Sequence, residues 1–198
     1  ADFYPNYIQT YVERDLRQIQ NVQNLTLFVR FLKLCAGRTG QLLNLNSLAN
    51  ECGVSSNTVK SWISVLEASY IIFLLQPHYI NYNKRLVRMP KLYFTDTGLA
   101  SSLLEIKSEK QLQTHYLRGA LFENFIISEF IKYRYNKGLR NNCYFWRDNK
   151  GSEIDCLLEN ENGLTPVEIK SGLTFNTDFF KQLKYWNKLS GNKPENSI

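Results

Sequence analysis

The chain has 198 residues, 43% hydrophobic and 21% charged, a composition that excludes disorder and suffices for one large or two small globular domains. Its net charge of +6 is compatible with nucleic-acid binding, although many unrelated basic domains share it. The longest apolar run, residues 70–75, is too short to cross a membrane, and the sequence contains no P-loop for ATP.

Cysteine and histidine usage argues against a zinc site. Four cysteines and two histidines are scattered along the chain, without the paired spacing that such sites use. Scattered cysteines in apolar surroundings, with no recognisable signal peptide, predict a reduced protein in the cytoplasm.

The first half of the chain has the pattern of a winged helix. Helical periodicity over residues 6–20 is followed by a second helix over 25–36, for which Asn24 is the expected N-cap. A short helix over 45–52, a turn at Gly53 and a helix over 54–66 form a helix-turn-helix pattern.

Two β-prone runs follow this pattern. They cover residues 70–75 and 92–94 and enclose a basic segment, as the wing of a winged helix would. The sequence then predicts a capped helix over 95–104, which ends the first domain, and a polar linker over 105–114.

The second half predicts the order α-β-β-β-α. A long helix over 117–133 precedes β-prone runs at 143–146, 153–158 and 166–170, and a helix over 175–189 closes the chain. We therefore predict the α+β class, with a helical winged-helix domain over residues 1–110 and a second domain over residues 111–198.

Carboxylates mark the second domain as a candidate metal site. Asp155 lies in an apolar strand, where an unpaired carboxylate is costly. Strand alternation puts Glu168 and Lys170 on one face of the next strand, and a hairpin would bring Asp155 to that face. Such carboxylates suit Mg²⁺ or Mn²⁺, and Lys170 would orient a water or stabilise the phosphate. The competing interpretation is a salt-bridged strand pair without chemistry.

This order resembles the restriction-endonuclease-like superfamily, written PD-(D/E)XK. The resemblance implies that Glu123, Asp155, Glu168 and Lys170 are catalytic, with the three carboxylates as metal ligands. Gln182 and Tyr185 are one residue closer than the Gln-x-x-x-Tyr of the RecB-like branch, so membership of that branch is not implied.

Nearly the whole chain is similar to the C-terminal region of a bacterial and archaeal AAA-type ATPase family. The matching stretches are YVERD (11–15), KRL (84–86), PKLYFTDTGL (90–99), GALFEN (119–124), FWRD (145–148) and VEIKSG (167–172). The resemblance implies a winged helix joined to a nuclease-like module. It also implies an ATPase domain that this chain does not contain, in agreement with the missing P-loop.

We expect two partners. DNA is expected to contact both halves of the chain, and the ATPase domain of the full-length protein is the second expected partner. Candidate nucleic-acid contacts lie on the second helix of the helix-turn-helix and in the basic segment, at Ser56, Asn57, Lys60, Lys84, Arg85, Arg88 and Lys91. No membrane contact is expected, and the sequence leaves homo-oligomerisation open.

Three functions remain open on the sequence. The first is Mg-dependent cleavage of DNA, and the second is a catalytically inactive module that binds DNA or protein for the ATPase domain. The third is a transcriptional regulator with a ligand-sensing second domain, for which sharp sequence-specific binding at high salt would be diagnostic.

Overall fold

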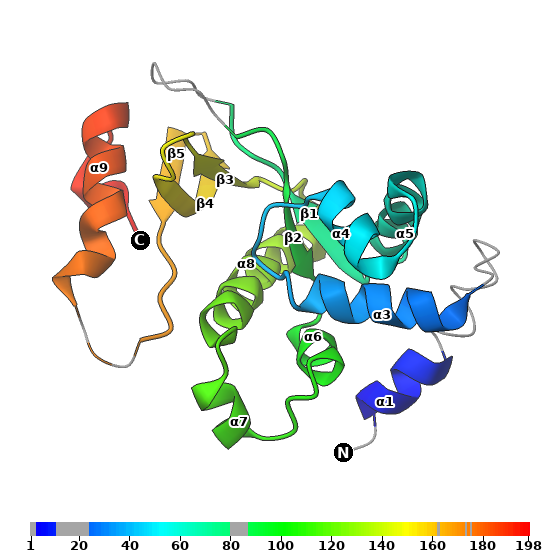
Figure 1. The fold of residues 1–198 in the computed structure, drawn as a ribbon. Helices are drawn as coiled ribbons and strands as arrows, with labels where there is room; N and C mark the ends of the chain where they lie inside the picture. Colours follow the sequence, from blue (N-terminus) through cyan, green and yellow to red (C-terminus); the bar gives the residue numbers. More distant parts are fainter. Residues whose placement is uncertain (1–2, 11–23, 80–86, 162, 173, 175) are drawn as a thin grey trace. The chain divides into compact units, whose positions relative to one another are not determined.

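The chain divides into two compact units, one made of residues 1–74 and 92–121 and the other of residues 75–91 and 122–198. The computed structural model in Figure 1 describes residues 3–10, 24–79, 87–161, 163–172, 174 and 176–198. Helices and two small sheets, ordered β1-β2 and β3-β4-β5, confirm the predicted α+β class. Within the described ranges, no helix combines the length and apolar content needed to span a membrane.

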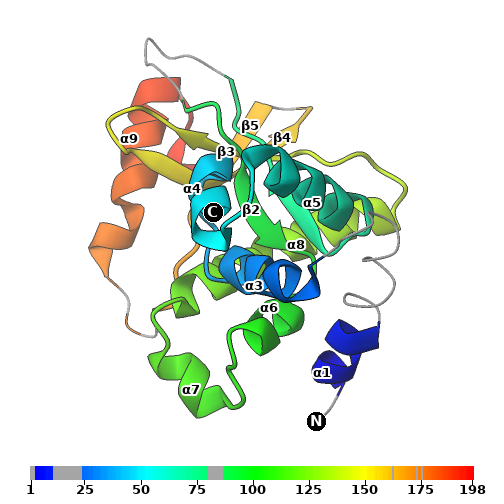
Figure 2. The same cartoon turned by 45° about the vertical axis from the view of Figure 1, so that its right-hand side comes forward.

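Three helices form the centre of the first unit, as predicted. They are α3 (Leu25–Ala36), α4 (Leu45–Cys52) and α5 (Ser56–Ala68), and Figure 2 views them from a second direction. Asn24 caps α3 by accepting from the Leu27 amide at 3.1 Å. Gly53 ends α4 with φ of 75°, a left-handed conformation that glycine adopts without the strain of a β-carbon.

Aromatic packing holds α3 against α5. The rings of Phe28 and Phe31 have centroids 5.3 and 5.2 Å from that of Trp62, and all three side chains are buried. Aromatic pairs at such distances contribute about 0.5–1.5 kcal/mol beyond the area they bury. The helix-turn-helix pattern in the sequence thus corresponds to a packed helical core.

The remaining elements of the first unit surround this core. They are α1 (Phe3–Tyr7), the paired strands β1 (Ile72–Leu75, up to residue 74) and β2 (Lys91–Phe94, from residue 92 onward), α6 (Thr97–Leu103) and α7 (Glu109–Thr114). The helix predicted over residues 6–20 lies mostly outside the described residues. The winged-helix assignment itself stays a prediction.

The linker predicted over residues 105–114 is partly wrong, because it contains the helix α7. Ser108 caps α7 by accepting from the Gln111 amide at 3.3 Å. Serine followed by helix-favouring polar residues is a start signal that the small number of apolar residues concealed.

The second unit contains an antiparallel sheet. It combines α8 (Arg118–Asn136, from residue 122 onward) with β3 (Cys143–Arg147), β4 (Glu153–Asn160) and β5 (Gly163–Val167), which follow each other in the sheet. Trp146 pairs with Ile154 across β3 and β4, and Cys156 pairs with Val167 across β4 and β5. The hairpin considered in the sequence for the strands of Asp155 and Glu168 is therefore present as β4 and β5, and β3 forms a further antiparallel pair with β4.

The third strand is displaced from its predicted range of 166–170. It ends at Val167, so Glu168 and Lys170 follow the strand instead of lying within it. The physical reason is a change of partner, since the Ile169 amide donates to the Asp155 side chain at 2.8 Å instead of to a β4 carbonyl. Glu168 donates its amide to the Ile198 carbonyl at 2.9 Å.

The closing helix consists of η2 (Thr177–Phe180) and α9 (Lys181–Ser190), followed by η3 (Pro194–Asn196). Figure 1 shows α9 beside β4 and β5, with which it is in contact. Trp186 of α9 meets Trp146 of β3 edge to face at 4.9 Å, and both rings are buried with Leu183 and Leu157. This core supports β4, the strand that carries Asp155.

Residues next to β1 and β2, at positions 76–78 and 87, lie along β3. Phe145 donates its amide to the Gln76 carbonyl at 3.1 Å and accepts from His78 at 2.7 Å, and Val87 donates to the Arg147 carbonyl at 3.1 Å. These bonds join the described residues on either side of positions 80–86 to the sheet of the second unit, to which Lys91 also belongs.

Candidate functional site

Asp155 is the centre of the candidate site. It lies on β4 between the buried residues Ile154 and Cys156, and Asp155 is itself buried. Its Oδ2 accepts from the Ile169 amide at 2.8 Å and from Lys170 Nζ at 3.4 Å. A backbone donor and an ammonium therefore satisfy the carboxylate and fix its orientation.

Glu168 is the second carboxylate of the site, with a side chain only 7% exposed. Its Oε1 accepts from Lys170 Nζ at 2.5 Å, whereas its buried Oε2 has no hydrogen-bond partner in the protein. Burial and the nearby Asp155 raise the pKa of Glu168 from 4.5 to about 7, against the opposing effect of Lys170. Glu168 is thus held close to its protonation midpoint at neutral pH.

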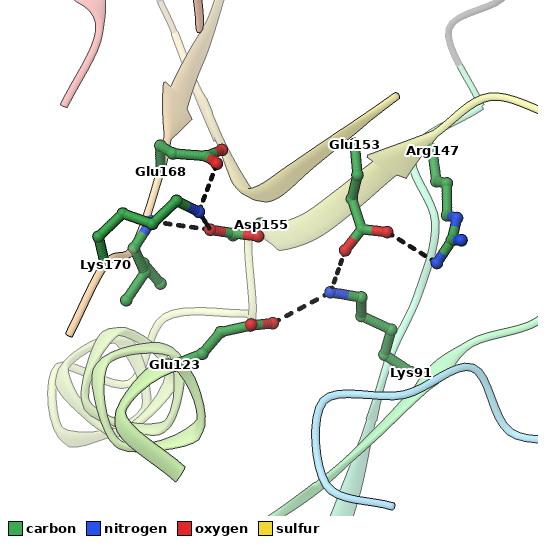
Figure 3. A network of polar contacts seen from close by, with 8 residues as sticks. Lys91, Glu123, Arg147, Glu153, Asp155, Glu168 and Lys170 are labelled. Carbon is green, nitrogen blue, oxygen red and sulfur yellow. Dashed lines mark hydrogen bonds and ion pairs between the residues drawn. The ribbon is translucent and has the colours of Figure 1, made fainter. Parts of the chain in front are cut away.

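Lys170 joins the two carboxylates. Figure 3 shows its ammonium between Asp155 and Glu168, to both of which it is bonded. Burial alone would lower the pKa of Lys170, but the two carboxylates raise it above the ordinary value, so the side chain carries a full charge. The structure thus brings together the predicted trio of Asp155, Glu168 and Lys170.

Glu123, the predicted residue of the preceding helix, lies in a second ion-pair group. It points from α8 toward Lys91, whose Nζ donates to its Oε1 at 3.0 Å (Figure 3). Lys91 also forms an ion pair with Glu153, and Arg147 Nη1 contacts the other oxygen of Glu153 at 3.0 Å. Glu123 therefore has a lysine as its direct partner, and its role as a metal ligand stays a prediction.

The two groups are electrostatically joined through Lys91. Its side chain is only 3% exposed, and burial would by itself lower its pKa, but Glu123, Glu153 and Asp155 together raise it. The ammonium also lies 5.5 Å from the centre of the Phe145 ring. Lys91 is therefore a permanently charged cation inside an acidic cluster.

Sequence reasoning missed this role of Lys91, which it placed among the nucleic-acid contacts. The structure buries the side chain between two glutamates, where no phosphate reaches it. The signal was a lone lysine at the start of the apolar run Leu92–Tyr93–Phe94, because a charge in a buried strand requires a partner.

The other predicted nucleic-acid contacts differ in exposure. Asn57, Lys60 and Arg88 are exposed, and Ser56 is half-buried with its hydroxyl 2.6 Å from Asn46 Oδ1. Lys84 and Arg85 lie outside the described residues. Of these exposed residues, Lys60 and Arg88 carry a positive charge that can neutralise a phosphate, whereas Asn57 can contact one only through a neutral hydrogen bond.

The chemistry of the donor set fits one hard cation at the Asp155–Glu168 pair. Both side chains offer carboxylate oxygens, and the buried Glu168 Oε2 has no hydrogen-bond partner in the protein. Across the part of the chain that the structure describes, however, no three or more Asp, Glu, His and Cys side chains are grouped to hold a metal. Any cation at this pair would therefore complete its coordination with water or substrate oxygens.

Comparison with known proteins identifies two families along the chain. A model described as Domain of unknown function (DUF8612) matches residues 1–110, and one described as Domain of unknown function (DUF4143) matches residues 118–198. Uncharacterized proteins of Mycobacterium bovis and Mycobacterium tuberculosis are each 30% identical over 170 residues, which cover 86% of this chain and 38% of theirs.

The chain thus spans 38% of the length of these curated relatives. No solved structure matches it significantly. Because the first of the two models covers more than half of its residues, the chain belongs to the family described as Domain of unknown function (DUF8612).

Proposed function

We propose that the second unit is a metal-dependent phosphodiesterase that cleaves DNA, with Asp155 and Glu168 as its carboxylate ligands and Lys170 as its catalytic cation. The observation that carries this proposal is the convergence of both carboxylates on Lys170, with one buried oxygen of Glu168 left without a protein partner. A purely structural salt bridge would not need to bury an unsatisfied carboxylate oxygen, which is costly.

The residues fit Mg²⁺ or Mn²⁺, which prefer carboxylate oxygens. Such an ion, when bound, lowers the pKa of a coordinated water and neutralises charge on a phosphate. Asp155 is oriented for this task by the Ile169 amide, and the buried sheet beneath it keeps the carboxylate in place. Glu168 follows the end of β5, so its side chain reaches the same point from the neighbouring strand.

Lys170 is the residue that meets the substrate. Its side chain is 39% exposed, in contrast to the buried carboxylates, so its ammonium is accessible to an incoming phosphate. Hydrolysis forms a bond from a water oxygen to phosphorus and breaks one ester P–O bond. The ammonium donates hydrogen bonds to the phosphate oxygens on which negative charge accumulates in that step.

The rest of the chain is assigned a targeting role in this proposal. The helix-turn-helix order of α4 and α5 and the exposed charges of Lys60 and Arg88 support DNA contact by the helical unit and the β1–β2 segment. The relatives are more than twice as long as the matched region, which leaves room for the ATPase domain implied by the sequence resemblance. We propose that this domain is the partner the module serves.

Cleavage assays on single- and double-stranded DNA with Mg²⁺ or Mn²⁺ test the proposal. Asp155→Asn and Lys170→Met should each lower the rate at least 100-fold, the usual scale for one electrostatic catalytic group. Glu129→Gln is the matched control, because Glu129 lies on α8 in an exposed pair with Lys132. Cleavage by Asp155→Asn and Lys170→Met at the wild-type rate would show that the site is assigned wrongly.

A second candidate function is a catalytically inactive module that docks DNA or a protein for the ATPase domain. The absence of a three-ligand group among the described residues favours it, as do the internal cations that already pair with every carboxylate of the site. Isothermal titration with Mn²⁺ separates the two candidates. An inactive module should show no binding that depends on Asp155.

A further inference from the structure

Lys91 occupies a position in the acidic cluster where a cation is electrostatically required. Glu123 comes from α8 and Glu153 from the first residue of β4, and both carboxylates meet at the same ammonium. The side chains of Glu123 and Glu153 are 16% and 21% exposed, so water screens their mutual repulsion only partly. Without a positive charge between them, two carboxylates would not remain this close in a largely buried position.

The lysine fills this position as a metal would, but with a fixed positive charge of one. An ammonium donates three hydrogen bonds, and here two are directed to Glu123 and Glu153. Burial of its side chain and the Phe145 ring 5.5 Å away keep it there. A divalent ion bound by Glu123 would have to approach within about 2.0–2.6 Å of its oxygens and displace this ammonium.

We propose that Lys91 is a positioning residue that serves as the resident cation of Glu123 and Glu153 and limits the module to one divalent cation, held by Asp155 and Glu168. The number of ions rests on the proposed function, whereas the role of Lys91 rests on the ion pairs alone. On this assignment Glu123 acts through Lys91 and is not a metal ligand.

The first test removes a carboxylate from each group. Bound Mn²⁺ is counted by electron paramagnetic resonance and its affinity is measured by calorimetry on the full chain. Glu123→Gln should change the affinity for Mn²⁺ less than threefold, and Asp155→Asn should weaken it at least tenfold. A tenfold loss in Glu123→Gln would make Glu123 a ligand and overturn the inference.

The second test removes the resident cation. Lys91→Met should bind one Mn²⁺ more than the wild type, because Glu123 and Glu153 then lack their shared ammonium and can rotate onto an ion. Adding Glu123→Gln to Lys91→Met should abolish the extra site. Lys132→Met, which removes an exposed lysine of the same unit, should bind Mn²⁺ as the wild type does.

The outcomes separate this inference from the proposed function. A wild type without any Mn²⁺ site refutes the proposed metal pair, yet an extra site in Lys91→Met would still support the role of Lys91. A folded Lys91→Met that binds no additional ion overturns the inference, whatever the wild type does. If Lys91→Met does not fold, by circular dichroism, Lys91→Gln is titrated instead, and the same two results decide.

Discussion

Glu168 shows at the level of a single residue how the candidate site differs from a stabilising salt bridge. Its pKa is about 7 instead of 4.5, chiefly because the carboxylate is buried. The folded protein therefore binds the proton more tightly than the unfolded chain does. The contribution of Glu168 to stability is fully present below pH 4.5 and is lost as the pH rises through 7.

The substitution Glu168→Gln removes this pH dependence. We expect it to raise the free energy of unfolding by about 1–3 kcal/mol at pH 8, because the pKa of Glu168 rises from 4.5 to about 7 on folding and the carboxyl is charged at that pH. Near pH 4, where the carboxyl is largely protonated, we expect no effect. Urea denaturation of both proteins at each of these two pH values, with a chelator present, measures the difference in the free energy of unfolding. The exposed Glu129→Gln is the control, and equal effects of Glu168→Gln at both pH values would contradict the prediction.

Removal of the Lys91 charge is expected to lower stability, whereas Glu168→Gln raises it. Its removal in Lys91→Met leaves Glu123 and Glu153 facing each other without their shared cation, so the free energy of unfolding should fall by about 3–5 kcal/mol. Neutralising both glutamates as well should recover most of this loss, because the uncompensated charges are gone. Denaturation of the single and triple variants in metal-free buffer tests this, and a triple variant as unstable as Lys91→Met would refute the electrostatic explanation.

Individual helices were the features that the sequence predicted best. Asn24 as a cap, Gly53 as a turn and the apolar spacing of Phe28 and Leu32 are local signals, and α3, α4 and α5 lie where these signals indicate. Local hydrogen bonds and side-chain periodicity determine such elements with little help from distant parts of the chain.

The features that were missed depend on contacts between residues far apart in sequence. β5 ends at Val167 because the Ile169 amide donates to the Asp155 side chain. Strand propensity depends on neighbouring residues and does not predict such a distant partner. The sequence predicts that Asp155, Glu168 and Lys170 lie together, but for a different reason. The prediction assumes that Glu168 and Lys170 alternate within a strand, whereas the strand ends at Val167. The ion pairs of Lys91 are not visible in the sequence, because its partners are 32 and 62 positions away in the chain.

The helix α9 provides a test of packing at the level of elements. Trp186 is fully buried against Trp146 and Leu157, so Trp186→Ala should lower the free energy of unfolding by about 3–5 kcal/mol. Phe180, just before α9, is 40% exposed, and Phe180→Ala should cost less than about 1 kcal/mol. Equal losses of stability in the two variants, measured by chemical denaturation, would show that α9 does not anchor the sheet.

Each of the two units has a hydrophobic core of its own at the scale of the whole molecule. One core is built around Phe28, Phe31 and Trp62, and the other around Trp146 and Trp186. The two family matches, over residues 1–110 and 118–198, likewise fall on separate halves. A division of labour between DNA contact and phosphate chemistry, as proposed above, is compatible with two such cores.

The net charge of +6 leads to the last prediction, because DNA contact through a basic surface is sensitive to salt. If DNA is the partner, the logarithm of the binding constant should fall linearly with the logarithm of the salt concentration. Each phosphate contact contributes a slope of about 0.9. Lys60→Gln and Arg88→Gln remove the exposed charges of the helix-turn-helix and of the β1–β2 segment, so each should reduce the slope by about 0.9 per lost contact.

Fluorescence anisotropy with a DNA duplex at about 50–200 mM salt measures these slopes. Lys132→Gln is the control, since Lys132 is paired with Glu129 on α8 and should leave the slope unchanged. Affinity that is independent of salt would be incompatible with phosphate contacts, because neutralising phosphates always releases counterions. A slope that persists when both Lys60 and Arg88 are neutralised would instead place the DNA on other cations of the chain, and the targeting role would then move away from the helix-turn-helix.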